Sequence, residues 1–232
     1  MQTLKADPAI ATHVRRLGGR VIAKEIRNRL SSRSTEVGLR CDLQRLPPLR
    51  EAAIPLTLEP CAGSFEGFAE ELERTTGADY GRVLRRMRLH EAGVQTLHVA
   101  RTEERQPVYV QWLLFEDDRV ALDAVAADFW PALGPRDVLL EFAYTFMPFR
   151  GMGVMGGAMG RLLRVAADAG ATTAYTYVAV DNIASLRGCA KVGFALDHMR
   201  DTAVRVGLRR SHIRPPVATE RESWEKATAP RA

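Results

Sequence analysis

The sequence predicts an α/β fold in which helices pack on the faces of a mixed β-sheet. The strongest observation is an apolar run over 138–146 that leads through a glycine-rich turn into a helical pattern over 155–166. Two runs rich in aromatic and β-branched residues, 94–101 and 108–115, flank a polar stretch and predict a hairpin. A further strand over 172–180 precedes a second helix. Strands and helices in this order favour a layered α/β domain.

The first third of the chain contains three predicted helices and one short strand. Residues 8–30 have apolar side chains near helical spacing, although a Gly-Gly pair interrupts them. Residues 31–35 are predicted as a loop, and Pro47-Pro48 as a linker, because proline cannot continue a helix. A strand over 54–58 follows. Ser64 and Asp79 are suitable N-caps for the other two helices, over 65–75 and 80–91.

The last third has clearer signals, whereas residues 117–136 receive no assignment. The central helix has apolar residues at i, i+3, i+4, i+7, i+8 and i+11, starting from Met155, and Gly170 is its expected C-cap. Asn182 begins a second helix over 183–191, and Gly193 ends it. The remaining strands are predicted over 194–199 and 203–208.

Composition excludes several classes of protein. The 232 residues are 46% hydrophobic and 26% charged, which is typical of a globular domain. No apolar run is long enough to span a membrane, and the N-terminus lacks the pattern of a secretory signal, so we expect a cytoplasmic protein. The three cysteines fit neither a disulfide framework nor a metal site.

Positive charge is concentrated at the N-terminus. Residues 1–50 carry 11 Lys and Arg against 4 Asp and Glu, a net charge of +7, which leaves −2 for the rest of the total of +5. We therefore predict a basic, helical N-terminal extension over 1–50, a body over 51–210 and a mobile tail over 211–232. The basic residues either form a solvated helical face or dock on nucleic acid, an anionic membrane or an acidic partner.

The turn over 149–156 joins a buried strand to the start of a helix, which is a favourable place for phosphate. The first N–H groups of a helix have no internal partner, and glycines let an anion approach them. The sequence is not a P-loop. A dinucleotide pattern overlays on the three glycines, but the next strand lacks the acidic ribose ligand that this pattern requires. A tight turn with glycines for helix packing is the alternative explanation.

A second motif follows one helix and one strand later. Asn182 leads a short helix that ends in Lys191, Gly193 and Phe194. Together with the Arg-Gly-x-Gly of the turn, this resembles the GNAT superfamily of N-acetyltransferases over roughly residues 54–210. The resemblance implies a mixed, mostly antiparallel sheet flanked by helices. It also implies direct transfer of an acetyl or longer acyl group from acetyl-CoA to an amine in a ternary complex.

The resemblance also implies which residues bind acetyl-CoA. The pyrophosphate would lie on backbone N–H groups of the turn, and the pantetheine would lie beside the preceding strand and be hydrogen-bonded by the Asn side chain. These cofactor contacts would be made by Phe146, Met147, Arg150, Gly151, Met152, Gly153, Val154, Asn182 and Ser185. Two departures concern Met155, where the family usually has Gly or Ala, and Cys189, where it usually has the Tyr that protonates the leaving thiolate.

Glu141 is the candidate general base. It is a lone carboxylate in an apolar strand, where burial raises the pKa toward a useful range, and the family often places a base on this strand. The alternative is a structural ion pair with Arg119 or Arg136. Among the other candidates, His98 is expected to make a structural hydrogen bond, and His198 to lie near the acceptor cleft.

The sequence does not single out one group as the proton donor to the leaving thiolate. Cys189 is expected to be a small buried packing residue. The thiolate would then leave unprotonated, or take a proton from a water, from Tyr175 or from Tyr177, which share one face of their strand.

The sequence therefore favours an N-acetyltransferase. The alternative is a catalytically degenerate acetyltransferase fold that binds acyl-CoA or docks on a partner. Nucleic-acid binding is disfavoured, because the N-terminal basic residues are not interleaved with aromatics. The acceptor would be bound by segments 64–92, 117–136 and 194–208. None of them contains a motif that identifies the acceptor. A homodimer remains open.

Overall fold

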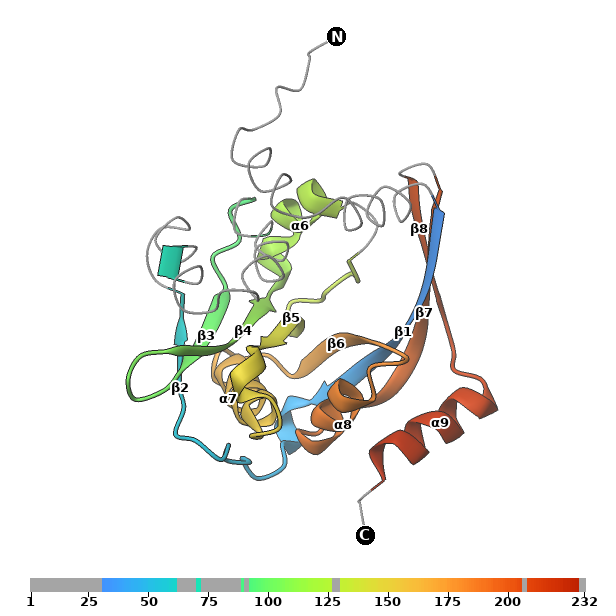
Figure 1. Cartoon of the computed structure of the whole chain (residues 1–232). Coiled ribbons are helices and arrows are strands. Elements are labelled where there is room, and N and C mark those ends of the chain that lie inside the picture. Colours follow the sequence, from blue (N-terminus) through green and yellow to red (C-terminus); the bar gives the residue numbers. More distant parts are fainter. Residues whose placement is uncertain are drawn as a thin grey trace, which may run out of the picture.

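The computed structural model describes residues 31–61, 70–71, 89, 92–126, 130–205 and 208–229. They contain a sheet of eight strands in the order β2-β3-β4-β5-β6-β1-β7-β8 (Figure 1). The strands are β1 (Ser31–Asp42), β2 (Thr57–Pro60), β3 (Leu97–Arg101), β4 (Pro107–Leu114), β5 (Asp137–Thr145), β6 (Thr173–Ala179), β7 (Ala195–Arg205) and β8 (Leu208–Arg214). The described α-helices are α6 (Arg119–Ala126), α7 (Val154–Asp168), α8 (Ile183–Lys191) and α9 (Ala218–Thr228).

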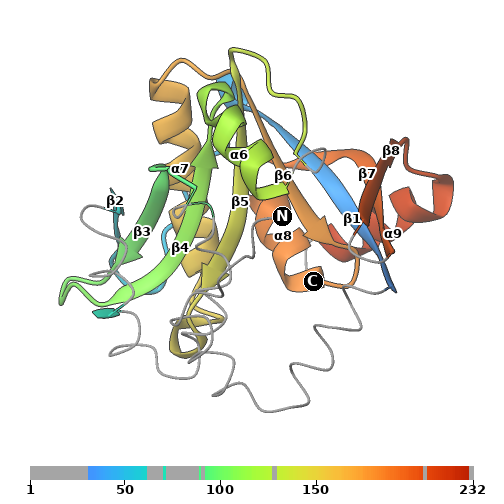
Figure 2. The same ribbon diagram turned by 90° about the horizontal axis from the view of Figure 1, so that it is seen from above.

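Strand directions confirm the predicted mixed, mostly antiparallel sheet. Only β5 and β6 are parallel among the described neighbours, and the other six pairs are antiparallel. Strands β3 and β4 form the predicted hairpin, and seen from above the strands follow one another across a twisted sheet (Figure 2). The predicted helices over 8–30, 65–75 and 80–91 lie largely or wholly outside the described residues.

The apolar run of β5 is explained by packing on both faces of the sheet. Val138 and Leu140 belong to a core cluster with α7, whereas Leu139 joins a second cluster on the opposite face with Trp112 and Leu122. A strand covered on both sides loses the alternation of a half-exposed strand. Burying each such leucine stabilises the fold by about 1.5–3 kcal/mol.

Helices α7 and α8 form where the sequence predicts them. The apolar stripe of α7 is buried against the sheet except for its first member, Met155, which is partly buried, and Gly170 adopts φ = +92° just beyond the helix end. Asn182 is the N-cap of α8, because its side-chain oxygen accepts a hydrogen bond from the Ser185 N–H at 3.3 Å. Both helices cover the same face of the sheet, which we call the α7 face (Figure 1).

Strand β1 lies inside the sheet, between β6 and β7. The predicted loop over 31–35 is therefore wrong, and the division at residue 50 is wrong for residues 31–42, which belong to the same sheet as the body. Alternate side chains of β1 enter the core of the α7 face, namely Val37, Leu39 and Cys41. Charged residues at the alternate positions, Glu36 and Arg40, hide this alternation in the sequence.

The C-terminal residues form regular structure, contrary to the predicted tail. Residues 194–208, predicted as two strands, contain the single strand β7, and β8 continues to Arg214. Helix α9 follows, and its Trp224 packs against the core cluster of the α7 face. Arg214 links the two parts, because its guanidinium pairs with Asp201 at 2.7 Å and with Glu220 at 2.7 Å.

Residues 47–54, which we call the strap, run along α7 in the opposite direction to the helix. Glycines permit this contact: a Cβ at Gly157 would lie 3.3 Å from the Arg50 carbonyl oxygen, and one at Gly160 would lie 3.0 Å from Leu49 Cδ1. Two hydrogen bonds tie the ends of the strap, from Arg164 to the Pro47 carbonyl at 2.8 Å and from the Ala53 N–H to the Met152 carbonyl at 2.8 Å.

The segment over 117–136 contains α6 and one turn of 3-10 helix before it. Among the described helices, none has the length and apolar composition required to cross a bilayer.

Candidate active site

Strands β5 and β6 pair only at their beginnings. Their parallel ladder joins residues 137–139 to 173–175, although both strands continue for at least four residues more (Figure 2). Beyond Leu139 and Tyr175 the two strands separate, which leaves a gap in the middle of the sheet. Glu141 and Tyr177 each come two residues after that last pair. By the period of two, they lie on the same face of the sheet, opposite the α7 face.

Glu141 is buried beside this gap. Only 7% of the residue is exposed, and among the described residues its Oε1 atom has no hydrogen-bond partner. Burial raises its pKa to about 7. The positive charge of Arg200 and a hydrogen bond from the Phe142 N–H lower the pKa, whereas the charge of Glu36 raises it further. A carboxyl group with this pKa exchanges protons readily near neutral pH.

A β-bulge follows Glu141 immediately. Trp112 of β4 pairs with Glu141 and Val110 pairs with Tyr144, so two residues of β5 oppose one residue of β4. Phe142, in the bulge, adopts φ = +57°, which is unusual for a bulky side chain. Bulges of this kind re-aim side chains and often lie next to active sites.

On the other side of the gap, three strands place a row of residues next to one another. Gly38 of β1 pairs with Tyr177 of β6 on one side and with His198 of β7 on the other. The His198 ring reaches over the glycine, and its Nε2 lies 3.1 Å from the Tyr177 hydroxyl. A Cβ at Gly38 would lie 2.3 Å from that nitrogen, so this row requires glycine. Asp197 lies 2.8 Å from His198 Nδ1.

Arg200 lies over the same row. Its guanidinium is 3.5 Å from the centroid of the Tyr177 ring, and it pairs with Glu36 at 2.8 Å, although only 2% of Arg200 is exposed. Burial raises the pKa of Tyr177 to about 12. Arg200 lowers it, and the nearby carboxylates raise it, Glu141 first among them. The phenol is therefore protonated throughout the physiological pH range.

The glycine-rich turn follows β5 along the chain and leads into α7. Gly151 has φ = +80°, and a Cβ built there would meet nothing within 4 Å, so this part of the turn is open. Helix α7 starts at Val154, and the N–H groups of its first turn lack acceptors within the helix. These features fit an anion such as the pyrophosphate of CoA.

Gly153 and Arg150 have local structural roles. Gly153 is the N-cap of α7 with φ = +74°, and a Cβ there would lie 3.6 Å from Ala52 of the strap. Arg150 turns back along β5, where its Nε donates to the Thr145 carbonyl at 3.1 Å and its guanidinium lies 5.4 Å from the Tyr144 ring centroid. The Met152 carbonyl accepts from the strap.

The predicted backbone contacts of the pantetheine fall just after β5. Phe146 uses its N–H for the Val108 carbonyl at 3.1 Å, and its own carbonyl accepts from the Phe149 N–H at 3.0 Å. Met147 begins a turn of 3-10 helix and is 54% exposed. An extra-strand contact at Phe146 would thus have to use the second lone pair of its carbonyl, and the contact at Met147 stays a prediction.

Asn182 and Ser185 lie at the exposed N-terminal end of α8. The cap hydrogen bond occupies the Asn182 side-chain oxygen and leaves its amide N–H groups as the donors toward a ligand. Between the helices, Met155 packs on α8, since its sulfur is 3.1 Å from the Cβ position of Gly188. The methionine that departs from the family pattern therefore fills space between the two helices.

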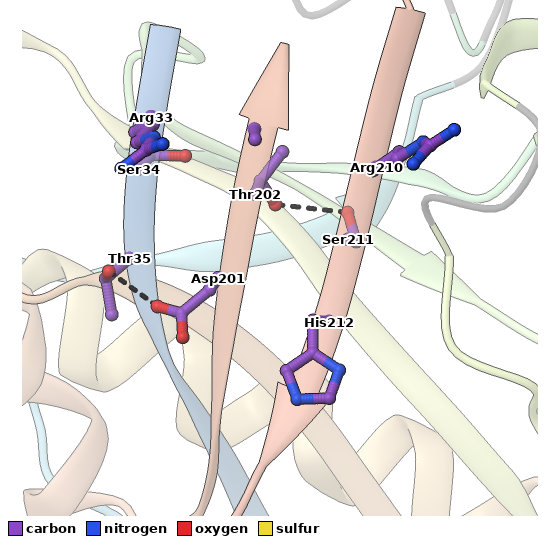
Figure 3. A pocket seen from close by; sticks show the side chains of 9 residues that line it. Arg33, Ser34, Thr35, Asp201, Thr202, Arg210, Ser211 and His212 are labelled. Carbon is purple, nitrogen blue, oxygen red and sulfur yellow. Dashed lines mark hydrogen bonds between the residues drawn. The ribbon is translucent and has the colours of Figure 1, made fainter.

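A second hollow is lined by β1, β7 and β8 (Figure 3). Its side chains satisfy one another: Thr35 donates to Asp201 at 2.7 Å, and the hydroxyls of Thr202 and Ser211 are 3.1 Å apart. We assign it no ligand. The lining residues are Arg33, Ser34, Thr35, Asp201, Thr202, Ala203, Arg210, Ser211 and His212.

Comparisons with known proteins identify the fold. No family model and no curated protein matches the sequence. A GCN5-related glucosamine N-acetyltransferase region of a fungal multi-domain β-N-acetylglucosaminidase matches with a TM-score of 0.50 at 14% identity, over 79% of this chain and 22% of that one. A GCN5-related N-acetyltransferase from Sphaerobacter thermophilus matches with a TM-score of 0.50 at 12% identity, over 81% of this chain and 57% of that one. The chain spans less than two thirds of the length of both.

The chain has the GNAT fold. Identities this low show the fold alone, so the chemistry has to be argued from the residues of this chain. In this sheet the first described strand, β1, lies between β6 and β7.

Cys189 is the main departure from the GNAT pattern. The thiol is fully buried in the core of the α7 face, and burial raises its pKa to about 12. It is thus the packing residue that the sequence favours. His98 also has the expected structural role, because its Nδ1 lies 3.1 Å from the Thr96 carbonyl oxygen.

The sequence does not indicate the charged partners of Glu141. Glu141 interacts with Arg200 and Glu36, whereas Arg119, one of the two arginines proposed for it, pairs with Asp123 at 2.8 Å. The sequence does not place Glu36 and Gly38 beside Glu141 and Tyr177, because no local pattern predicts β1. Arg200 and His198 are two apart on β7, and only this period-2 spacing could have linked them.

Proposed function

We propose that the protein is an acyl-CoA-dependent N-acetyltransferase that transfers an acetyl group, or a related acyl group, to an amine by direct attack. The observation that carries this proposal is Glu141: a buried carboxyl group with a pKa near 7 and an unpartnered oxygen, beside the gap between β5 and β6. The GNAT fold and the open turn at Gly151 support acetyl-CoA as the donor.

In the proposed reaction, acetyl-CoA and the amine bind together. The turn over 150–154 binds the pyrophosphate, and the amide of Asn182 hydrogen-bonds the pantetheine. Backbone N–H groups where the strands separate stabilise the oxyanion that forms on the thioester carbonyl. Glu141 takes a proton from the amine, directly or through a water, as nitrogen attacks the carbonyl carbon.

The residues around the gap favour an amine as the acceptor. Glu36, Glu141 and Asp197 are acidic. The positive charge of Arg200 pairs with only one of them, Glu36. Such a surface attracts a cationic amine, and Glu141 can then help to remove the proton that makes the amine non-nucleophilic.

The test is release of thiol from acetyl-CoA with three amines: a polyamine, an amino sugar and a lysine-containing peptide. Glu141→Gln preserves the shape of the side chain and removes the base. We expect turnover to fall by about 10²–10⁴-fold while the Kd for acetyl-CoA, measured by calorimetry, stays within twofold. Wild-type turnover in the variant would assign Glu141 a structural role.

A second candidate is an acyl-CoA-binding module on a degenerate GNAT fold. The replacement of the usual Tyr by a buried Cys189 favours it. Such a protein would bind acetyl-CoA in the calorimeter and release no thiol with any of the amines.

A further inference from the structure

The proposed reaction leaves a thiolate that needs a proton, and Cys189, at the position of the usual Tyr, does not supply it. Cys189 is fully buried among apolar side chains, with its pKa raised to about 12. A donor must instead reach the gap between β5 and β6, where the acyl group would lie. Among the described residues of β6, the tyrosines on the same face as Glu141 are Tyr175, in the last paired position, and Tyr177, where the strands have separated.

We propose that Tyr177 donates the proton to the leaving thiolate, and that His198 and Asp197 hold its hydroxyl in place and return the proton afterwards. This inference rests on the proposed acetyltransferase function. It assigns a second catalytic residue, Tyr177, and two positioning residues on strand β7.

The first support is the position of Tyr177 relative to Glu141. If the parallel register of β5 and β6 continued, Glu141 and Tyr177 would be partners. Since the strands separate, the two side chains lie on opposite sides of the gap and on one face of the sheet. Their charges interact, because Glu141 contributes to the raised pKa of Tyr177. A base and an acid on opposite sides of a thioester could serve the nucleophile and the leaving group separately.

The second support is how the hydroxyl is held. His198 Nε2 lies 3.1 Å from the Tyr177 oxygen, and the two rings meet edge to face with centroids 5.4 Å apart. Asp197 accepts from His198 Nδ1–H at 2.8 Å, which fixes the tautomer and leaves Nε2 directed at the tyrosine. Gly38 between them leaves room for the ring. A hydrogen-bonded chain of three side chains, one from β6 and two from β7, thus passes over the glycine of β1 between them.

The third support is electrostatic. Arg200 stacks on the Tyr177 ring at 3.5 Å, so it favours the phenolate that forms when the proton leaves. Burial keeps the phenol protonated before that, with a pKa of about 12, whereas the pKa of Glu141 is about 7. Two titratable groups with such different pKa values are suited to opposite proton-transfer roles.

Each proton in the step has a source and a destination. The N–C bond forms as the C–S bond breaks; the amine proton moves to the Glu141 carboxylate, and the Tyr177 hydroxyl proton moves to sulfur. The phenolate regains a proton from water, relayed through Nε2 of the His198 imidazole, while Nδ1–H stays hydrogen-bonded to Asp197. The imidazole is 14% exposed, so water reaches it, and Glu141 releases its proton to water. The products are a neutral amide and a free thiol.

The experiment compares two acyl donors that differ in the acidity of the leaving thiol. Turnover of wild type and Tyr177→Phe is measured with acetyl-CoA and with the acetyl thioester of 4-nitrothiophenol, whose thiolate leaves without a proton. We expect Tyr177→Phe to lose about 10²-fold in kcat with acetyl-CoA, the low end of a general-acid effect, and threefold or less with the activated donor. Equal losses with both donors would overturn the proposal.

Two further variants complete the test. Tyr175→Phe removes the same atom two residues earlier on the same face, and it should retain turnover within threefold with both donors. His198→Gln keeps a hydrogen-bonding group but cannot carry the proton; it should lose turnover with acetyl-CoA and recover with the activated donor. A loss in Tyr175→Phe equal to that in Tyr177→Phe would also contradict the assignment. If wild type releases no thiol from acetyl-CoA with any amine, the proposed function itself fails.

Discussion

Glu141 and Tyr177 occupy equivalent positions on the two strands that separate, each two residues beyond the last hydrogen-bonded pair, Leu139 and Tyr175. The sheet therefore brings a carboxyl group and a phenol to opposite sides of one gap. The bulge at Phe142 lies directly after the carboxyl group, and Gly38 lies directly beside the phenol. Both residues are thus held by backbone features that side-chain substitutions elsewhere would leave intact.

The buried Glu141 should make stability depend on pH. Its pKa rises from 4.5 in the unfolded chain to about 7 in the folded protein, so folding favours the protonated form. This contribution is complete below about pH 4.5 and is lost as the pH rises through 7. The difference in pKa corresponds to about 3 kcal/mol in the free energy of unfolding. Subtracting the profile of Glu141→Gln from that of wild type, by urea unfolding at pH 4.5–8, should show this decline; a flat difference would contradict the burial of the charge.

The turn offers a matched pair of variants for the binding of CoA. Gly151 has a positive φ and open space around it, and Asn and Asp tolerate this conformation better than other side chains. Gly151→Asn and Gly151→Asp differ by one negative charge and little in shape. We expect the Asp variant to bind CoA at least tenfold more weakly than the Asn variant in calorimetry, with similar melting temperatures. Equal affinities would place the pyrophosphate elsewhere.

Gly153 is less suitable for that purpose. Its Cβ position is already in van der Waals contact with Ala52 of the strap, so loss of binding in a variant with a larger side chain would not separate a blocked anion site from a displaced strap.

Gly38→Ala should destabilise the fold through a clash with one side chain, that of His198. The added methyl group would lie 2.3 Å from His198 Nε2, so we expect a loss of about 1–3 kcal/mol in the free energy of unfolding. In the background of His198→Ala the clash disappears, and the same substitution should cost well under 1 kcal/mol. Chemical denaturation of the four proteins in this cycle measures the coupling; additive effects would mean that the ring does not lie over residue 38.

Cys189 should behave as a core residue. Because it is fully buried and the pKa of its thiol is raised to about 12, alkylation at pH 8 should reach Cys61, which is only half-buried, well before Cys189. Mass spectrometry of the partly alkylated protein gives the order. Cys189→Ala should retain turnover within a fewfold, whereas Cys189→Tyr should overpack the core and destabilise the fold by about 1–3 kcal/mol.

Much of the fold follows from periodicity in the sequence. The helix from Val154, the helix capped by Asn182 and the buried strand before the turn were predicted within a few residues, because each has a local pattern and a local end signal. Glu141 could be singled out for the same reason, as one carboxylate within an apolar strand. Signals of this kind need no knowledge of distant partners.

The rest of the site depends on strand register, which no local pattern contains. That Gly38 lies between Tyr177 and His198 follows from two ladders whose strands are far apart in the sequence. Glu36 and Arg40 interrupt the apolar pattern of β1 in the sequence, whereas in the folded sheet Glu36 pairs with the buried Arg200. Arg200 is similar, since nothing in the sequence around it indicates that this arginine of β7 will be buried on a tyrosine ring.

The position of β1 also determines when the protein can finish folding during synthesis. Its nearest partner residue on β6, Thr173, follows Asp42 by 131 residues, and its partners on β7 come later still. At about 5–20 residues per second, a ribosome needs on the order of ten seconds to make that stretch. During this time neither of the strands that pair with β1 has been synthesised. Pairing between residues so far apart in the sequence also slows folding. Residues 36 and 38 are therefore synthesised early but reach the site among the last, so a nascent chain has no complete row of Tyr177, Gly38 and His198 until β7 has emerged.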